Sequence, residues 1–287
     1  MKNAYLNNLQ IHDNTQNIGY WLKPNIQGLE MPAIRLPIVE RPNFDGASVP
    51  NQLYGGRAIT LEGKVVGSTV AEYRSRREAL ISAVKIYRPA GVLTPITFKF
   101  KTMTDLELQV EVFSRKPTIP DKFLTSADYS LELFAQDYRI FSQELHQIRL
   151  NIFEGGGMSI PMAIPMDMSV GGSVETSVNN AGNIPSRPYI VIYGSIEDPT
   201  ISNQTTDESF SIDYTLTTSD ERIEIDMETR TVLYYSSPTA TGLNIRQYFT
   251  GDWFELEPGN NTVKLTVAEV TDTGYAEVRW RDAYIGI

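Results

Sequence analysis

The sequence predicts a mainly β protein, in which a small α+β unit is followed by a β-sandwich. Only one stretch, residues 69–87, has a helical pattern, whereas short strands separated by turns account for most of the rest, and the composition changes near Gln143. A chain of 287 residues is long for one core and comfortable for two, given domains of roughly 100–200 residues. We therefore expect domains at residues 1–145 and 146–287, with a loop-rich lead-in over residues 155–185.

The first domain is organised around the helix expected at residues 69–87. Thr69 is followed three residues later by Glu72, a spacing that lets the hydroxyl and the carboxylate each accept a hydrogen bond from a free amide of the first turn. The apolar residues at helical spacing are Tyr73, Leu80, Ile81, Val84 and Tyr87. Pro89 and Gly91 end the helix. Because a lone amphipathic helix is marginally stable in water, we expect strands to cover this apolar stripe.

The strands of the first domain are expected on both sides of this helix. In chain order they span residues 4–11, 18–22, 29–36, 57–67, 95–100, 106–113 and 129–134. The pair 95–100 and 106–113 forms a hairpin around residues 102–105. Residues 41–47 combine proline, asparagine and Asp-Gly, which is typical of a surface turn or loop.

The second domain has a purely β pattern from Val174 onward. Its strands are expected at residues 188–193, 210–216, 221–227, 232–235, 263–267 and 276–280. Within residues 222–228 apolar and charged residues alternate, so one face of that strand is expected to be wet. Many short strands joined by regular turns indicate a sandwich or a jelly roll.

The segment between the domains is rich in glycine, methionine and proline and has no periodicity. The three glycines at residues 155–157 indicate a linker rather than a phosphate-binding loop, because no Lys-Ser or Lys-Thr and no helix follow them. Four methionines in this segment either fill a core or form an adaptable contact surface. They are Met158, Met162, Met166 and Met168.

The net charge of −10 is unevenly distributed along the chain. Residues 1–146 hold 17 Lys and Arg against 15 Asp and Glu, whereas residues 147–287 hold 8 against 20. The acidic second half does not favour wrapping nucleic acid, which needs a basic surface, and suits a solvated face instead. The sequence has no apolar run of about 20 residues, so we expect neither a membrane span nor a classical export signal.

The residue inventory argues against an enzyme, a metal site or a cofactor site. The chain has no cysteine and only two histidines, His12 and His146, neither of which accompanies a nucleophile motif. We therefore expect no catalytic residue, no metal ligand and no cofactor. The carboxylates at residues 221–228 leave a glycosidase pair or a calcium site open as alternatives, although Glu224, Asp226 and Glu228 alternate on one strand face like solvated residues.

Aromatic residues offer one candidate ligand contact. Trp253 and Phe254 are adjacent and must point to opposite sides of a strand, so one of them can be exposed and stack on a sugar ring. Trp280 alternates in phase with Ala276 and Val278 and is expected in the core. Trp253 is therefore the predicted carbohydrate contact.

Five short segments of the second half occur in an order and spacing that is typical of one protein family. They are Asn179-Asn180-Ala181-Gly182, then residues 188–194, 225–232 and 254–261, and finally residues 278–284. Together they resemble the C-terminal domain of distal tail proteins (Dit) of long-tailed, non-contractile bacteriophages. The strand ending at Gly67, the helix with Arg76 and Arg77, and residues 133–137 are similar to the hub domain of that family. Tyr138 stands where the family often has proline.

The resemblance implies a fold and a structural role in the virion. The first domain is expected to be a ring-forming hub, a β-sandwich with one helix, and the second a galectin-like or jelly-roll β-sandwich. The implied protein forms a homohexameric ring that joins the tail tube protein to the tail-tip or tail-associated protein of the baseplate. The ring leaves a channel for DNA ejection and lies at the virion tail tip, after synthesis in the host cytoplasm.

Two alternatives stay open from the sequence. One is a carbohydrate-binding tail or baseplate module that attaches to host cell wall through aromatics such as Trp253, and the other is an enzyme acting on that wall. Receptor-binding proteins or a cell-wall saccharide would then be further partners. Ring closure would need a heterologous interface, for which residues 57–66 and the loop at 41–47 are candidates. We expect the near-neutral hub to line the channel and the acidic sandwich to face outward.

Overall fold

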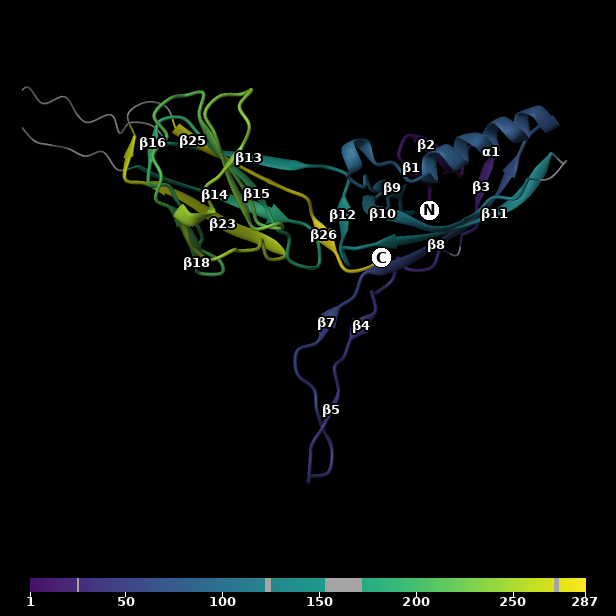
Figure 1. Ribbon diagram of the computed structural model, residues 1–287, viewed down its shortest axis with the longest axis horizontal. Coiled ribbons are helices and arrows are strands. Elements are labelled where there is room, and N and C mark those ends of the chain that lie inside the picture. Colours follow the sequence, from purple (N-terminus) through teal and green to yellow (C-terminus); the bar gives the residue numbers. More distant parts are fainter. Residues whose placement is uncertain (25, 122–124, 153–171, 271–273) are drawn as a thin grey trace, which may run out of the picture. The chain divides into compact units, whose positions relative to one another are not determined.

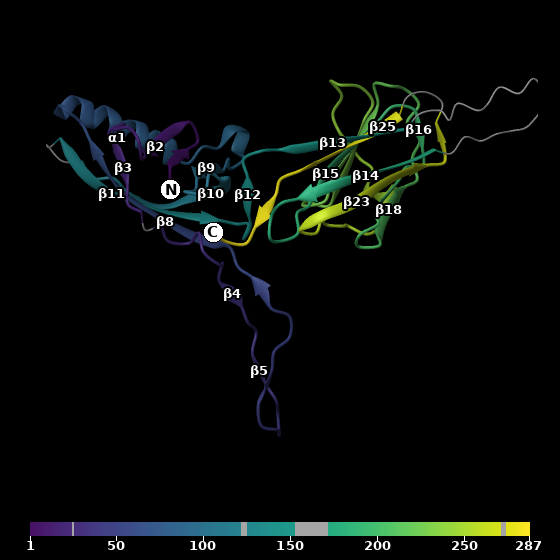
Figure 2. The same cartoon turned by 180° about the vertical axis from the view of Figure 1, so that it is seen from behind.

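The computed structural model of this protein describes residues 1–24, 26–121, 125–152, 172–270 and 274–287. The chain is mainly β, as predicted, and divides into two compact units (Figures 1 and 2). The first unit comprises residues 1–143 together with 284–287, and the second comprises residues 144–283. The glycines at 155–157 and the four methionines that follow them lie outside the described residues. Among the helices that are described, none has the length and apolarity needed to cross a membrane.

The first unit contains a sheet in the order β2-β1-β9-β10-β11-β8-β3. Its strands are β1 (Asn3–Leu6), β2 (Leu9–Asp13), β3 (Tyr20–Leu22), β8 (Arg57–Val66), β9 (Ile96–Lys101), β10 (Glu107–Thr118) and β11 (Ser126–Ala135). The long strand β10 joins two parts of the sheet, because its first half pairs with β9 and its second half with β11. The pairing of β10 with β11 shifts its register between Ser114 and Lys116, near the point where β10 changes partner. Such an irregularity is typical of a bend in a strand. The short strand β12 (Ile140–Ser142) also pairs with β10.

Alternating apolar residues explain why these segments form strands around one core. In β8 and β9 every second residue is buried, and Ile59, Leu61, Phe98 and Phe100 are fully enclosed. The predicted hairpin at residues 95–113 is confirmed. The strand predicted at residues 4–11 was wrong, because β1 and β2 form a hairpin there, and Asn7 makes its turn with a φ of 52°.

The helix α1 (Val70–Val84) starts as predicted and ends earlier. The Thr69 hydroxyl accepts a hydrogen bond from the Glu72 amide at 3.2 Å, and the Glu72 carboxylate accepts one from the Ser68 amide at 2.6 Å. The predicted end at residue 87 was wrong because Lys85 is already extended. Tyr73, Leu80 and Val84 pack into the core, whereas Ile81 and Tyr87 are exposed. The 3-10 turn η1 (Pro89–Gly91) follows.

The second unit is a β-sandwich of two antiparallel sheets around one core. One sheet has the order β13-β25-β15-β19-β20-β21, with β13 (His146–Ile152), β15 (Tyr189–Tyr193), β19 (Arg222–Asp226), β20 (Thr231–Tyr235), β21 (Leu243–Asn244) and β25 (Gly274–Trp280). The other has the order β14-β23-β17-β18-β22, with β14 (Gly172–Asn180), β17 (Thr200–Asn203), β18 (Glu208–Ile212), β22 (Phe249–Gly251) and β23 (Gly259–Val267). The remaining elements are β16 (Ile196–Glu197), β24 (Glu269–Val270), η2 (Arg246–Tyr248) and β26 (Ala283–Tyr284). Because β14 pairs with β23 from residue 172, the loop-rich lead-in expected over residues 155–185 is interrupted by a strand.

Three fully buried asparagines fix the loops at one end of this sandwich. Asn180 donates to the carbonyls of Ile184 and Leu256 at 2.9 and 3.0 Å. Asn203 donates to the Asn261 side chain at 3.2 Å, and Asn261 in turn donates to the Glu257 carbonyl at 2.8 Å. A buried amide must satisfy its hydrogen bonds, so these side chains specify the loops that contain two of the resembling pieces.

Candidate functional site

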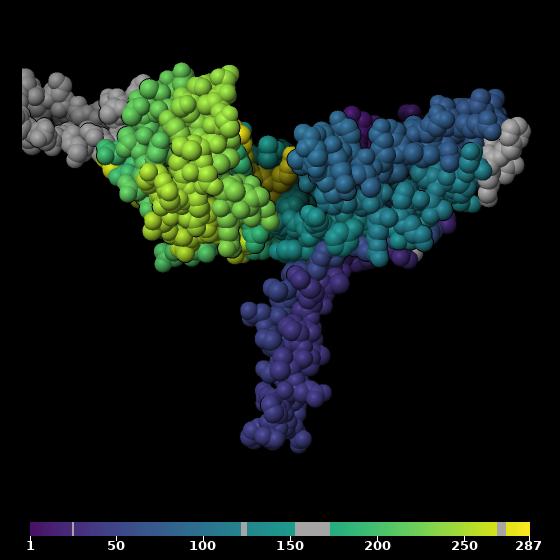
Figure 3. Space-filling model, in the orientation of Figure 1, coloured from purple at the N-terminus to yellow at the C-terminus, as the bar shows by residue number. Residues whose placement is uncertain are grey.

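A long hairpin, called the arm here and comprising residues 33–54, projects from the first unit (Figures 1 and 3). Its strands are β4 (Ile34–Arg35), β5 (Val39–Glu40), β6 (Ala47–Ser48) and β7 (Leu53–Tyr54), which pair as β4 with β7 and β5 with β6. Every residue of the arm is exposed. The sequence prediction placed a surface turn at residues 41–47, which is the tip, but did not foresee that the whole segment leaves the domain. The strand predicted at residues 29–36 was accordingly wrong, since only β4 forms there.

The arm exposes an unusual amount of apolar side chain. Its large apolar residues are Ile34, Leu36, Ile38, Val39, Phe44, Val49, Leu53 and Tyr54. Residues paired across two strands share a face, so Ile34 and Tyr54 lie on one face while Leu53 lies on the other beside Arg35. Both faces are therefore apolar and neither covers a core. Contiguous exposed apolar surface of this kind marks an interaction site.

The tip of the arm holds one aromatic side chain at its apex. The Arg41 amide donates to the Gly46 carbonyl at 3.3 Å, which closes the tip turn. Asn43 and Gly46 have positive φ values of 71° and 93°, which asparagine and glycine tolerate best. Phe44, between them, is 78% exposed. The turn therefore presents a phenyl ring to the solvent.

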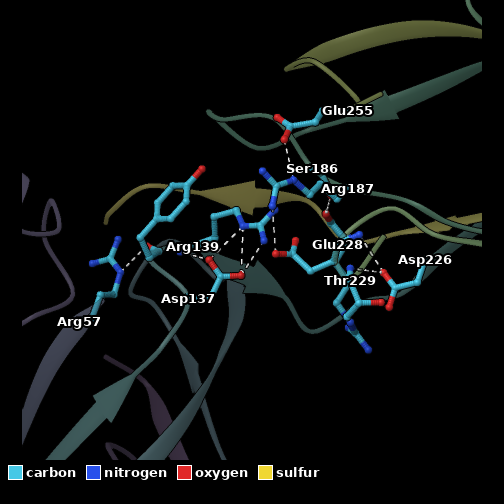
Figure 4. Close-up of polar contacts among 11 residues, drawn as sticks. Arg57, Asp137, Arg139, Ser186, Arg187, Asp226, Glu228, Thr229 and Glu255 are labelled. Atoms are coloured by element: carbon cyan, nitrogen blue, oxygen red, sulfur yellow. Dashed lines mark hydrogen bonds and ion pairs between the residues drawn. The ribbon is translucent and has the colours of Figure 1, made fainter. Parts of the chain in front are cut away.

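The root of the arm is held by Arg57, which is only 2% exposed (Figure 4). Its guanidinium donates to the carbonyls of Gly28 at 3.1 Å, of Glu30, of Ile285, and of Tyr138 at 2.5 Å. Burial lowers the pKa of this guanidinium from its ordinary value, while the charges of Asp137 and Glu30 act in the opposite direction. Arg57 lies at the start of β8, which follows the arm. Its side chain thus connects β8 to the segment that precedes the arm and to the end of the chain.

Other contacts at the root make it rigid. Tyr54 stacks on Tyr138 with ring centroids 5.0 Å apart, and the Gly55 amide donates to the Ala33 carbonyl at 2.7 Å. Gly28 has a φ of 90°, and a Cβ there would meet the Ala58 carbonyl oxygen at 2.0 Å, so only glycine fits. The arm is thereby an element with a fixed base. The sequence contained a signal for Arg57, since it occupies the inward phase of the β8 alternation.

A separate polar network covers the outer face of the β13-containing sheet in the second unit. Tyr193 and Tyr275 stack at 4.8 Å, and the Arg149 guanidinium lies 3.9 Å from the Tyr275 centroid. Arg222 covers the Tyr235 ring at 4.1 Å. Each of these rings therefore has at least one face occupied by another ring or by a guanidinium group, which does not favour sugar stacking there.

The predicted carbohydrate contact, Trp253, is half-buried against the core of the second unit. Its ring stacks on Phe249 with centroids 4.1 Å apart, and the Arg246 guanidinium lies 4.9 Å from its centroid. Its neighbour Phe254 is fully buried, and Trp280 is in the core as expected. Sugar contact by Trp253 stays a prediction.

The carboxylates at residues 221–228 are engaged rather than free. Burial raises the pKa of Glu221 and Glu224, but hydrogen bonds outweigh it and hold both pKa values below their ordinary value. The partners include the Thr217 amide for Glu221, and Tyr189 at 2.6 Å and Arg222 at 2.7 Å for Glu224. A glycosidase acid needs the opposite, a raised pKa, so this pairing does not favour the enzyme alternative.

The remaining carboxylates of this stretch have structural partners (Figure 4). The Arg187 guanidinium donates a hydrogen bond to the Glu228 carboxylate at 3.1 Å and another to the Glu255 carboxylate at 2.6 Å. Asp226 accepts from the amides of Glu228 and Thr229 and so closes the turn after β19. Among the described residues no group of three side chains is arranged to hold a metal ion.

Comparison with known proteins defines the class to which this architecture corresponds. Residues 181–284 match the family model described as the siphovirus-type tail component, C-terminal domain. The second unit is therefore similar to the C-terminal domain of that tail-component family. No curated protein matches the sequence.

Two solved structures resemble the whole chain. SPP1 Dit, described as a paradigm of the hub adsorption apparatus in phages that infect Gram-positive bacteria, has a TM-score of 0.60 at 13% identity, covering 98% of both chains. A chain of the phage p2 baseplate in its activated conformation with Sr has a TM-score of 0.50 at 7% identity, covering 96% of this chain and 97% of that one. The resemblance to the distal tail protein family is thus confirmed, and the fold is Dit-like.

Proposed function

We propose that this protein is a structural virion component that assembles with copies of itself into a hexameric ring at the tail tip. The observation that supports self-assembly is the arm, in which every residue from 33 to 54 is exposed and eight are large and apolar. Leaving that surface in water is unfavourable, at roughly 25 cal/mol per Å² of apolar area. An assembly that buries the arm removes this cost.

The ring would join the tail tube protein to the tail-tip or tail-associated protein of the baseplate. The Dit-like fold and the family match at residues 181–284 support this placement. A ring needs a heterologous contact, in which one surface of each subunit meets a different surface of the next. The arm supplies one such surface, because it stands apart from the rest of its unit (Figure 3).

The charge distribution supports a channel that lets DNA pass without holding it. The net charge is +2 over residues 1–146 and −12 over residues 147–287, from the counts of basic and acidic residues given above. Neither value provides the dense basic surface that displaces phosphate counterions. The first unit would line the channel, and the acidic second unit would face outward.

The first prediction concerns the mass and shape of the purified full-length protein. Light scattering on a sizing column is expected to give the mass of six subunits, and negative-stain images are expected to show rings with open centres. A variant in which Arg35–Leu53 is replaced by a two-residue Asn-Gly hairpin turn is expected to stay monomeric, because the turn closes the hairpin without the apolar surface.

Two results would contradict the proposal. One is a monomer of the full-length chain at every concentration that also fails to co-purify with the tail-tip protein of its virion. The other is rings of unchanged mass from the arm-deleted variant. The circular dichroism spectrum of that variant is the control, since the remaining sheet should be unchanged.

A further inference from the structure

The first unit contains an apolar cavity at the base of the arm. It has a volume of about 480 Å³ and is lined by Met1, Ile26, Leu29, Met103, Leu106 and Ile287, among others. Met1, Ile26 and Leu106 also pack against the core, so the floor of the cavity is fixed. Met103, at the rim, is 64% exposed, and methionine adapts readily to an incoming side chain. The cavity is large enough for an aromatic ring and its neighbours.

The tip of the arm carries a side chain that suits this cavity in size and polarity. Phe44 is the most exposed aromatic side chain of the described residues and stands at the apex of the tip turn. The same turn holds Arg41 and Asp45, whose charges cancel, so the tip brings no net charge to the cavity edge where Glu30 lies. The tip therefore offers an exposed phenyl ring, and the cavity offers an apolar lining of sufficient size to receive one.

The arm cannot fill the cavity of its own copy. Leu29 and Glu30, which line the cavity, directly precede the arm, whereas Phe44 lies at the far end. Phe44 lies eleven positions after Ala33, and at about 3.3 Å per residue an extended strand of that length holds the tip roughly 35 Å from the base. The root contacts of Arg57 and Tyr54 keep the hairpin extended from that base. The occupant must come from a second molecule.

We propose that Phe44 of one copy occupies this cavity on the next copy. The inference rests on the proposed ring and names its contact. Each subunit then has one knob and one hole at opposite ends of the arm, which is the heterologous arrangement that a ring requires. Because the hole lies at the arm base, an arm that runs along the circumference spaces neighbouring bases by roughly 35 Å. In a regular hexagon the side equals the distance from the centre to a corner. The six arm bases would therefore lie roughly 35 Å from the ring axis.

Cysteine cross-linking tests this contact directly, because the natural chain has no cysteine. The full-length double variant D45C/M103C, which keeps Phe44 and places a cysteine beside it at an exposed position, is oxidised at low concentration and run on a non-reducing gel. We expect a ladder of covalent oligomers that ends at the hexamer and collapses on reduction. Each single variant should give dimers at most. Both positions are exposed, so neither substitution disturbs the core.

A matched pair distinguishes this cavity from another exposed apolar surface of the same unit. Val92, beside η1, is 68% exposed and lies outside the cavity, so D45C/V92C should give no ladder. A ladder from D45C/V92C and none from D45C/M103C would overturn the proposed docking site while leaving the ring intact. A monomeric mass of the natural chain, with no ladder from either pair, would overturn the ring as well.

The ring mass gives a second readout. Removing the phenyl group in F44A should weaken each contact by roughly 10- to 100-fold, from the usual value of burying such a side chain. Scattering should then show dissociation at concentrations where the natural chain stays assembled. V49A, which shortens another exposed apolar residue of the arm, should cause a smaller loss, and F44L should retain part of the affinity. Equal effects of F44A and V49A would contradict the anchor role of Phe44.

Discussion

At the scale of single residues, the most informative side chains are arginines that satisfy backbone carbonyls or buried carboxylates. Arg57 donates to four carbonyls from three separate segments at the arm root, and Arg149 with Arg279 encloses Glu277 on the second unit. A guanidinium suits both tasks because it offers five donors in a fixed plane. Buried carbonyls without donors are costly, so removal of such an arginine affects more than one segment.

Replacing Arg57 by methionine tests the clamp at the arm root. The change keeps much of the side-chain volume but leaves the four carbonyls around the buried Arg57 site without their donor, so we expect the unfolding free energy to fall by about 3 kcal/mol. Urea denaturation of the full chain measures this loss. Arg35→Met, on the exposed arm, is the matched control and should cost less than about 0.5 kcal/mol. A loss below about 1 kcal/mol for R57M would show that the carbonyls find other partners.

The contacts of Glu277 lead us to expect that the unfolding free energy of the protein depends on pH. Burial alone raises its pKa, but hydrogen bonds from Arg279 at 2.5 Å and Arg149 at 2.9 Å outweigh burial and hold the pKa below the ordinary 4.5. A carboxylate whose pKa is lowered by folding stabilises the protein above its unfolded pKa. This stabilisation disappears as the pH falls through the lower folded pKa.

The variant E277Q should therefore be less stable than the natural chain by about 1–2 kcal/mol at pH 7, with the difference shrinking below pH 4.5. Denaturant titrations at several pH values measure this difference. Glu175→Gln, at an exposed position, should leave the profile unchanged. A difference between E277Q and the natural chain that stays constant down to acidic pH would mean that the charge of Glu277 does not matter.

At the scale of elements, the helix and the arm differ in where their apolar side chains lie. The helix α1 has an apolar stripe, and its Tyr73, Leu80 and Val84 are buried against the sheet. The arm has apolar residues on both faces and no sheet to cover them. One element is thus stabilised by its own domain, whereas the apolar surface of the other is left for the proposed neighbouring subunit.

The helix cap can be tested alone. Thr69→Ala removes the hydroxyl that accepts a hydrogen bond from the Glu72 amide. We expect this change to lower the unfolding free energy by about 1 kcal/mol. Thr69→Ser keeps that hydrogen bond and should lose little. The comparison is made by urea denaturation followed by circular dichroism. Equal losses in both variants would assign the effect to the methyl group instead of the cap.

At the scale of the whole molecule, the chain combines two cores with an arm that belongs to neither. Each core includes mostly residues that alternate along strands, so both units are self-contained. The proposed ring of identical subunits would use three features of the chain: the arm, the cavity at the arm base and the uneven charge.

The sequence alone determined the local structure of this protein. Alternating apolar residues predicted β8 to β11 and the sandwich strands β15, β18, β19, β20, β23 and β25, but they did not predict β13, β14 or β17. The Thr69–Glu72 spacing predicted the start of the helix. These signals depend on residues close together in the chain. The motif order also identified the family resemblance, which the family model at residues 181–284 confirms.

Tertiary structure decided what depends on distant residues. Whether residues 33–54 fold onto the sheet or leave it depends on contacts at the root, including a carbonyl 228 positions from Arg57. The helix end depends on which residues the sheet can cover, so Ile81 and Tyr87 stay exposed although they fit the helical stripe. The cavity likewise combines residues from both ends of the chain. Local pattern specifies which segments form strands and helices, whereas long-range packing determines which apolar surfaces are left for another molecule to cover.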